Sequence, residues 1–425
     1  MEESFRPPSQ QSGVKKILIL GAGYGGLRAA TRLEQALRAY PKAEVLLVDQ
    51  FDQHQLITEL HEVAASSIPP EAATIPLSRL LAGKAVAYRR CTVTGLDFEA
   101  QRVVTDAGEL SYDILVISLG SETDFFGIEG LKEHSLTLKS LPDALLIRDH
   151  VDNMFALARN EPDAEARKRL LTFVVGGGGF TGTELAGELA DRVRELTREA
   201  GIPGEDLRVV VVEASHTLLS GFDPGLVRTA REILELKGVE LHLGTPAVKA
   251  TRDALELKGG QVIRNHTLIW TGGVKAHVLA ERSGLRTGVR GRVIVNPYMQ
   301  TVDYANVYAV GDVALVLNPE TGRPLAPSAQ LALQEADNAA RNILADLNGL
   351  ERVEFRPRVA GEVVSVGRKD ALAKIGPLAF DGRLAHWLKR MTVLRYLYTL
   401  GGFQLAWDWL SLMRNPRKKA SAMPD

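Results

Sequence analysis

Two glycine-rich turns of the same pattern, far apart in the chain, constrain the fold more than any other feature of the sequence. The first, GAGYGG, spans residues 21–26, and the second, GGGFTG, spans residues 177–182. Each follows an apolar run typical of a buried strand, at 14–20 and 171–175, and precedes a segment with helical spacing. In such a unit the glycines allow a tight turn and the close approach of a pyrophosphate, whose charge the helix N-terminus attracts. One such turn is weak evidence, but the pair predicts two dinucleotide-binding domains.

An acidic residue ends the second strand of each unit. The apolar run at 44–48 ends in Asp49, and the run at 207–212 ends in Glu213. A carboxylate at this point can accept hydrogen bonds from a ribose. No Arg or Lys follows directly after Glu213, and a carboxylate repels a 2′-phosphate. The second site is therefore expected to bind NADH rather than NADPH.

A third strand with an acidic end occurs later in the chain. Residues 307–310 have the pattern of a strand and lead into Gly311 and Asp312. An isolated Asp at such a place would be a turn or helix-capping residue. Beside two dinucleotide domains, however, Asp312 is a candidate for holding the ribitol of a flavin. Two nucleotide sites are most economically explained by a tightly held FAD at the first and a diffusing NADH at the second.

The composition excludes several classes of protein. Cys91 is the one cysteine, so the chain can form neither an internal disulfide nor a Cys-x-x-Cys pair nor a multi-cysteine metal site. The net charge of −1 does not attract nucleic acid. His54, His61 and Glu62 lack the spacing of a zinc motif, and no metal is expected. Residues 1–13 are expected to be a flexible tail, and no uncharged apolar stretch is long enough to predict a membrane-spanning helix.

Beyond these turns, the sequence resembles the type II NADH dehydrogenases, which are single-subunit NADH:quinone oxidoreductases of the two-dinucleotide-binding flavoprotein superfamily. The matching segments are LILGAGYGGLRAA (18–30), HQLITELHEVAAS (54–66), DILVISLGSETDFFGI (113–128), VVGGGGFTGTELAGEL (174–189), LIWTGGV (268–274), VYAVGD (307–312) and APSAQLALQEA (326–336). The last is the most discriminating. Glutathione-reductase-like relatives share the glycine turns but carry a reactive disulfide, whereas this family has a quinone pocket beside the flavin, formed in part by an Ala-Gln-x-Ala-x-Gln stretch.

The resemblance implies a set of site residues. For FAD they are Gly21, Gly23, Tyr24, Gly26, Asp49, Gly120, Gly311, Asp312, Ala329 and Gln330. For NADH they are Gly177, Gly179, Thr181, Gly182, Glu184, Glu213 and Gly273. Four residues are implied in the reaction. Glu184 is the family's active-site glutamate, Gln330 and Gln334 belong at the flavin edge and the quinone carbonyl, and Lys374 belongs near the quinone. The two glutamines are four residues apart and so share one helix face. Without the resemblance, Glu184 would be a first-turn residue that complements the helix dipole, and the others would be surface residues.

The sequence departs from the family at two positions. Glu59 and His61 occur where other members often carry aliphatic and aromatic residues, in a segment expected near the flavin and the quinone. The choice of quinone therefore stays open. Two other functions also stay open: a reductase of a small redox protein such as ferredoxin or rubredoxin, and a redox sensor that binds FAD and NADH without turnover. Sulfide:quinone reductases share the scaffold but use several cysteines, which this chain lacks.

The C-terminal region is amphipathic and rich in tryptophan. Two helical segments are expected, separated by Gly401 and Gly402 and followed by basic residues. Their apolar positions are Leu384, Trp387, Leu388, Met391, Leu394 and Tyr398 in the first, and Phe403, Leu405, Trp407, Trp409, Leu410 and Leu412 in the second. Such helices can lie in a bilayer interface, or they can pack on the body or a second subunit. A lipid-soluble quinone favours the bilayer surface, contacted through residues 384–419, and a homodimer through this region is compatible with it.

The expected fold is α/β, with two tandem Rossmann-like domains and a C-terminal amphipathic helical membrane-binding segment. The FAD domain is expected at 14–135 and 293–350, and the NADH domain at 160–292 is inserted after a connection at 136–159. A strand or loop cover near the quinone is expected at 351–383, and the membrane-associating region at 384–425. The resemblance implies transfer of a hydride from NADH to FAD and of two electrons to a membrane quinone, without proton pumping. Such an enzyme is expected to be peripheral, on the cytoplasmic face of the cell membrane.

Overall fold

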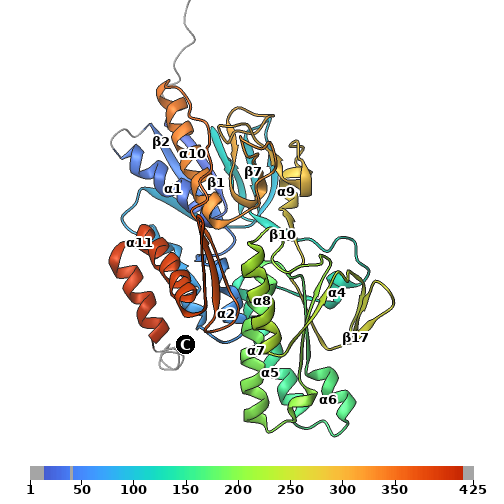
Figure 1. Cartoon of the computed structure of the whole chain (residues 1–425). Helices are drawn as coiled ribbons and strands as arrows, with labels where there is room; N and C mark the ends of the chain where they lie inside the picture. Colours follow the sequence, from blue (N-terminus) through green and yellow to red (C-terminus); the bar gives the residue numbers. More distant parts are fainter. Residues whose placement is uncertain (1–13, 39–41, 415–425) are drawn as a thin grey trace, which may run out of the picture. The chain divides into compact units, whose positions relative to one another are not determined.

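A five-stranded parallel sheet organises the first of two units in this computed structural model, which describes residues 14–38 and 42–414 (Figure 1). Its order is β21 (Val307–Ala309), β9 (Ile114–Ile117), β1 (Lys15–Leu20), β2 (Ala43–Asp49) and β5 (Val86–Arg90). All four neighbouring pairs are parallel. Ile17 to Leu20 of the central strand are fully buried. A continuous apolar strand of this kind is typical of a parallel sheet whose two faces are both covered.

Helices follow and cover this first sheet. α1 (Tyr24–Leu37) begins directly after Gly23, and it packs against α10 (Ala329–Asn348). The guanidinium of Arg28 on α1 donates to the carboxylate of Asp337 on α10 over 2.7 Å. The remaining elements of the unit are β6 (Val93–Asp97), β7 (Arg102–Thr105), β8 (Gly108–Ser111), α9 (Val278–Arg282), β20 (Val293–Ile294) and β22 (Ala314–Leu315).

A second parallel sheet of five strands organises the other unit. Its order is β11 (Leu136–Thr137), β18 (Thr267–Trp270), β12 (Thr172–Gly176), β13 (Arg208–Glu213) and β14 (Val239–Leu243). The helices with it are α3 (Leu77–Leu80), α4 (Leu131–His134), α5 (Leu141–Ala158), α6 (Ala164–Leu170), α7 (Phe180–Ala200) and α8 (Pro224–Leu236). An antiparallel sheet of β15 (Ala247–Thr251), β16 (Ala254–Leu257) and β17 (Val262–Arg264) extends it.

The start of α7 differs from the position expected from the sequence. The sequence predicts Glu184 on the first turn, but the helix already begins at Phe180, because extended Gly179 caps it from inside the glycine turn. Glu184 is therefore the fifth residue of α7 and lies beyond the first turn. A role confined to the helix dipole, which acts mainly on the first turn, does not account for it.

The second unit also contains the C-terminal helices. An antiparallel sheet of β23 (Glu362–Ser365), β24 (Ala371–Ile375) and β25 (Leu378–Asp381) packs against α11 (Gly382–Arg414). The backbone of α11 is not helical at Gly401 and Gly402, and Gly402 has a φ of 69°, which favours glycine. The two segments expected from the sequence are thus confirmed. They lie side by side, with the Arg390 guanidinium 5.9 Å from the Trp409 ring centroid (Figure 1).

A short segment from the N-terminal third of the chain belongs to the second unit as well. It forms β3 (Gln53–Gln55), α2 (Leu60–Ala64) and β4 (Thr74–Pro76). The first unit comprises Met1–Asp52, Leu81–Ser121 and Ala276–Arg358, and the second comprises Gln53–Leu80, Glu122–Lys275 and Val359–Asp425. The domain limits expected from the sequence stay a prediction, and they place 53–80 with the first dinucleotide domain. The tail at 1–13 and the basic residues 417–419 lie outside the described residues.

Among the helices that the structure describes, none is both long and apolar enough to cross a bilayer.

Candidate functional site

The two glycine turns have the same geometry. A Cβ atom at Gly26 would lie 1.8 Å from the carbonyl oxygen of Gly21, and one at Gly182 would lie 1.9 Å from that of Gly177. Only glycine allows this approach of helix and strand. At Gly23 and Gly179, by contrast, no described protein atom lies within 4 Å of the Cβ position. The backbone at these two glycines is therefore open to a phosphate, as a dinucleotide site requires.

The acidic strand ends support the two turns in the same way. Asp49 Oδ2 accepts a hydrogen bond from Ala22 N over 2.6 Å, and Glu213 Oε2 accepts one from Gly178 N over 2.5 Å. Ala22 and Gly178 occupy the second position of their turns. Burial raises the pKa of Asp49 above its ordinary value, against the hydrogen bonds that it accepts. Each carboxylate oxygen has a further lone pair, so both residues can still accept from a ribose.

The other residues expected at the FAD site lie in the first unit. Asp312 Oδ2 accepts from Ser121 Oγ over 2.7 Å. Gly311 N donates to Glu335 Oε2 over 2.6 Å, and burial raises the pKa of Glu335 to about 7. Gly120 has a φ of 71° in the loop after β9. Tyr24 and Ala329 are the first residues of α1 and α10.

The structure brings Gln330 and Gln334 together on one face of α10, as expected. Both side-chain amides donate to the carbonyl oxygen of Arg358, over 3.3 Å and 2.9 Å, and Arg358 N donates back to Gln334 Oε1 over 2.9 Å. The two glutamines thus hold the irregular segment between α10 and β23. Their expected roles at the flavin edge and the quinone carbonyl stay predictions.

The residues expected at the NADH site, and Lys374, lie in the second unit. Thr181 is exposed on the first turn of α7, and the carbonyl oxygen of Gly273 accepts from Asp124 N over 3.0 Å. Lys374 forms an ion pair of 2.6 Å with Asp223, at a partly exposed position. Lys374 therefore has a partner other than Glu184, and its role near a quinone stays a prediction.

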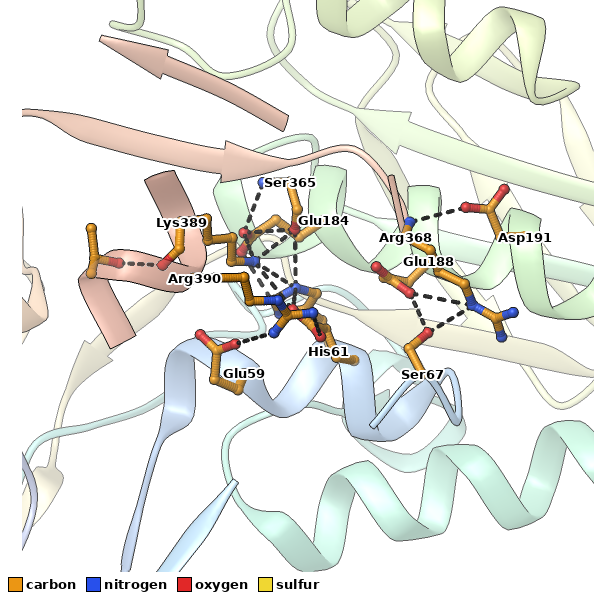
Figure 2. A network of polar contacts seen from close by, with 12 residues as sticks. Glu59, His61, Ser67, Glu184, Glu188, Asp191, Ser365, Arg368, Lys389 and Arg390 are labelled. Atoms are coloured by element: carbon orange, nitrogen blue, oxygen red, sulfur yellow. Dashed lines mark hydrogen bonds and ion pairs between the residues drawn. The ribbon is translucent and has the colours of Figure 1, made fainter. Parts of the chain in front are cut away.

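Glu184 lies in a buried cluster that four elements of the second unit build (Figure 2). Lys389 of α11 donates from Nζ to Glu184 Oε1 over 2.8 Å, to Ser365 Oγ over 2.7 Å and to His61 Nε2 over 3.0 Å. Ser365, at the end of β23, also donates to Glu184 Oε1 from its backbone N over 3.1 Å. A lysine ammonium can only donate hydrogen bonds, so His61 Nε2 is the acceptor and the proton of the neutral ring is on Nδ1. His61 Nδ1 lies 3.8 Å from Glu184 Oε2.

The buried charges of this cluster nearly balance. Lys389 and Arg390 are the cations, and Arg390 donates to Glu62 Oε2 over 2.6 Å and lies 3.4 Å from Glu59 Oε2. Burial acts against the charge of Glu62, but Lys389 and Arg390 together lower its pKa to about 2. Burial also acts against the charge of Lys389, yet the carboxylates of Glu184 and Glu62 raise its pKa.

The remaining groups of the cluster are neutral near neutral pH. Burial, reinforced by the charge of Glu62, raises the pKa of Glu59 to about 8, so it holds a proton. Burial lowers the pKa of His61 to about 4. Glu184 is the exception, because the His61 ring, the Lys389 ammonium and the hydrogen bonds from Lys389 and Ser365 overcome burial and lower its pKa. Two carboxylates, Glu62 and Glu184, thus face two cations.

Sequence reasoning missed Lys389 and Ser365 as partners of Glu184. The available signal was a four-residue interval in α11, where Ala385, Lys389, Val393 and Leu397 form the buried stripe. A single charged side chain in a stripe of otherwise small or apolar residues indicates a buried partner of opposite charge. Glu59 and His61 depart from the family pattern in the sequence, but their contacts with Arg390 and Lys389 of α11 join parts of the chain that no local pattern connects.

Two parallel sheets, each with a glycine turn and an acidic strand end, define the class of flavoproteins that bind two dinucleotides. The family model described as pyridine nucleotide-disulphide oxidoreductase matches residues 15–341. With one cysteine, Cys91, this chain cannot form the internal disulfide in that description.

The comparison with individual proteins is more specific. The type II NADH:quinone oxidoreductase of Staphylococcus saprophyticus is 34% identical over 397 residues, which covers 92% of this chain and 97% of that one. The enzyme of the same name from Staphylococcus aureus is 33% identical over 399 residues, with the same coverage. The chain belongs to the type II NADH:quinone oxidoreductase family. A solved structure of NDH2 from Plasmodium falciparum in complex with NADH shares the fold, with a TM-score of 0.84 at 17% identity over 96% of this chain and 99% of that one.

Proposed function

We propose that this oxidoreductase transfers a hydride from NADH to FAD and passes two electrons on to a membrane quinone, without pumping protons. The observation that carries the proposal is the presence of two glycine turns with matching acidic strand ends in a chain whose relatives are named for NADH and quinone. When bound, the flavin supplies the chemistry that links a two-electron donor to a quinone. The residues of the chain bind, orient and exchange protons.

The residues of the first unit fit FAD. The open backbone at Gly23 suits the pyrophosphate, Asp49 suits the ribose and Asp312 suits the ribitol. In the second unit, Gly179 and Glu213 suit NADH in the same manner. No Arg or Lys follows Glu213 among the next three residues, so the segment directly after it supplies no lysine or arginine to balance a 2′-phosphate.

The Glu184 cluster suits the reaction because quinone reduction consumes protons. The Glu184 side chain is 12% exposed, against 1% for Glu59 and for Glu62, so Glu184 is the most accessible carboxyl group of the cluster. Lys389 and Ser365 fix its position by three hydrogen bonds to one oxygen. Glu184 is thus proposed as the residue that exchanges a proton at the active site, with Lys389 and Ser365 orienting it.

The exposed face of α11 suits a bilayer surface. Its buried stripe carries Lys389, whereas the large apolar side chains point outward; Leu384, Trp387, Met391, Tyr398, Phe403 and Trp407 are all exposed. Val393, Leu397, Leu405 and Trp409 are buried instead, and Trp409 Nε1 donates to Ala72 O. An exposed apolar and aromatic face of this size indicates an interaction surface. We propose that it contacts the cytoplasmic face of the cell membrane, and a homodimer through the same face is the alternative.

One experiment tests the proposal. The purified protein is expected to show the visible spectrum of a flavoprotein, to bleach with NADH and to regain its colour with a soluble quinone analogue. Faster reoxidation by ferredoxin or rubredoxin than by quinone would favour the redox-protein reductase, and bleaching without reoxidation would favour a sensor. A proton gradient built by NADH oxidation in sealed vesicles that contain no other pump would contradict the absence of pumping.

A further inference from the structure

Reduction of a quinone by NADH requires one proton from solvent. The balance is NADH, one proton and quinone giving NAD⁺ and quinol, because the hydride brings two electrons and only one of the two hydrogens. The source of the other proton is a question that the proposed function raises, and the inference below rests on that function. Glu184 alone is a poor source, since its surroundings lower its pKa and keep it ionised.

A second buried carboxyl lies one helical turn beyond Glu184 on α7. Glu188 is 1% exposed, and its Oε2 accepts a hydrogen bond from Ser67 Oγ (Figure 2). Ser67 Oγ in turn accepts from Arg368 Nε over 3.0 Å. The Arg368 side chain is 26% exposed and forms an ion pair with Glu195, which is 37% exposed. Glu188 is thus connected to the surface by a hydroxyl and a partly exposed guanidinium.

On its inner side, Glu188 faces the Glu184 cluster. α7 packs against α2, which carries Glu62. Among the described residues, Glu62 Oε1 is a buried oxygen without a hydrogen-bond partner, and it lies 3.7 Å from Lys389 Nζ. Glu62 Oε1 is therefore an open acceptor beside the ammonium that holds Glu184, and the charge of the same carboxylate acts on Glu188.

The charges around Glu188 allow it to gain and lose a proton near neutral pH. Burial and the charge of Glu62 raise its pKa to about 7, against the hydrogen bond from Ser67 and the charges of Lys389 and Arg368. The titratable and charged groups around it are His61 and Glu62 of α2, Glu184, Asp191 and Glu195 of α7, Arg368 of the loop after β23, and Lys389 and Arg390 of α11.

We propose that Glu188 takes up the solvent proton beside Ser67 and passes it by way of Glu62 Oε1 to the Lys389–Glu184 pair, which gives it to the reduced quinone. Because Glu184 is ionised, the proton that reaches the quinone comes from Lys389 Nζ: its N–H bond breaks as an O–H bond forms at Glu184 Oε1, and that O–H bond breaks as one forms at the quinone oxygen. The proton of Glu188 then replaces the one that Lys389 has lost, through Glu62 Oε1, and no electron passes through these residues. After the quinol leaves, Glu188 takes up the next proton. It acts through Lys389 and Glu184 and needs no contact with quinone.

The test separates the two halves of the reaction in Glu188→Gln. Bleaching by NADH needs no solvent proton, so its rate is expected to stay within about twofold of the wild-type rate. Reoxidation by a soluble ubiquinone analogue is expected to slow by about tenfold or more, and the solvent isotope effect on that step is expected to rise. A small permeant acid such as formic acid should restore part of the rate. The control is Glu199→Gln, the same change at an exposed residue of the same helix, which should alter neither half.

Three results would overturn the inference: an unchanged pH profile of reoxidation in Glu188→Gln, an equal slowing of both halves, or no rescue by the acid. If Glu188→Gln does not fold, Ser67→Ala serves, since it removes the hydroxyl that connects Glu188 to Arg368. Infrared difference spectra provide a readout without quinone. A protonated carboxyl band that titrates near neutral pH is expected in the wild type and should be lost in Glu188→Gln. If no quinone reoxidises the wild-type protein, the proposed function fails, and the infrared titration still decides whether Glu188 carries a proton.

Discussion

The Lys389 ammonium donates to Glu184 Oε1 over 2.8 Å at a position withdrawn from solvent, where α11 meets α7. The pair is embedded among further charges, because Lys389 also lies 3.7 Å from Glu62 Oε1. Burying an ammonium is costly unless carboxylates compensate for its lost hydration, and the reverse holds for each carboxylate. The attachment of α11 to the second unit therefore depends on the completeness of this cluster rather than on apolar contacts alone.

Removal of the cation is expected to destabilise the protein strongly. Lys389→Met leaves Glu184 and Glu62 short of a partner and should lower the free energy of unfolding by about 3–5 kcal/mol. Denaturant unfolding measures this loss. In the double variant with Glu184→Gln, the loss should be smaller than the sum of the two single losses, because one uncompensated charge is gone. Lys374→Met, which breaks the partly exposed pair with Asp223, is the control and should change stability little. Additive losses would contradict a coupled cluster.

Glu59 should impose a pH dependence on stability. Its pKa of about 8 in the folded protein lies above the ordinary value of 4.5, so the folded state binds a proton that the unfolded state releases. The stabilisation is complete below the ordinary pKa and is lost as the pH rises through about 8, at most about 1.4 kcal/mol per pH unit. Glu59→Gln, which mimics the protonated form, should remove this decline.

Urea unfolding between about pH 5 and 8 measures the difference between Glu59→Gln and the wild type. The exposed residue Glu71 provides the control, since Glu71→Gln should shift the curve by a constant amount or not at all. Parallel curves for Glu59→Gln and the wild type would show that Glu59 is ionised in the folded protein.

Local patterns were sufficient to predict the framework of both nucleotide sites. A strand, a glycine turn and a helix are adjacent in sequence, and an acidic residue marks the next strand end. The expected strands at 44–48 and 207–212 agree with β2 (Ala43–Asp49) and β13 (Arg208–Glu213) to within one residue. The physical reason is that turn geometry and burial are properties of short segments.

The Glu184 cluster could be predicted only in part. Glu184 follows a motif, but Lys389 reaches it from α11, where the sequence pattern draws attention to the face that carries the tryptophans. Which face of an amphipathic helix packs inward depends on what the rest of the chain presents. Here α2 and α7 present Glu62 and Glu184, so the face with the lysine is buried and the apolar face is left outside.

Glu213 should determine the choice between NADH and NADPH. Glu213→Gln keeps one oxygen that can accept from Gly178 N and gives up the acceptor of Ser215 N, so the glycine turn keeps its hydrogen bond while the charge that repels a 2′-phosphate is removed. The ratio of kcat/KM for NADPH to that for NADH should rise by about tenfold, or about 1.4 kcal/mol. Steady-state rates with both nucleotides measure the ratio. Asp49→Asn, the matched change at the first turn, should leave the ratio unchanged, and a ratio that does not move in Glu213→Gln would place the adenosine ribose elsewhere.

The exposed aromatic face of α11 should control binding to lipid. Trp387 and Phe403 are 57% and 71% exposed, so replacing both with Ser removes little packing and should leave the unfolding free energy within about 1 kcal/mol of the wild type. If the face enters a bilayer interface, each aromatic side chain that is removed no longer contributes its burial in lipid, a free energy of at most about 1.5–3 kcal/mol. Binding to vesicles of anionic phospholipid should then weaken by more than about tenfold. Vesicle sedimentation measures the binding. Leu236→Ser is the control, because Leu236 is 83% exposed on α8. Unchanged sedimentation together with a shift from dimer to monomer would instead assign this face to a second copy of the chain.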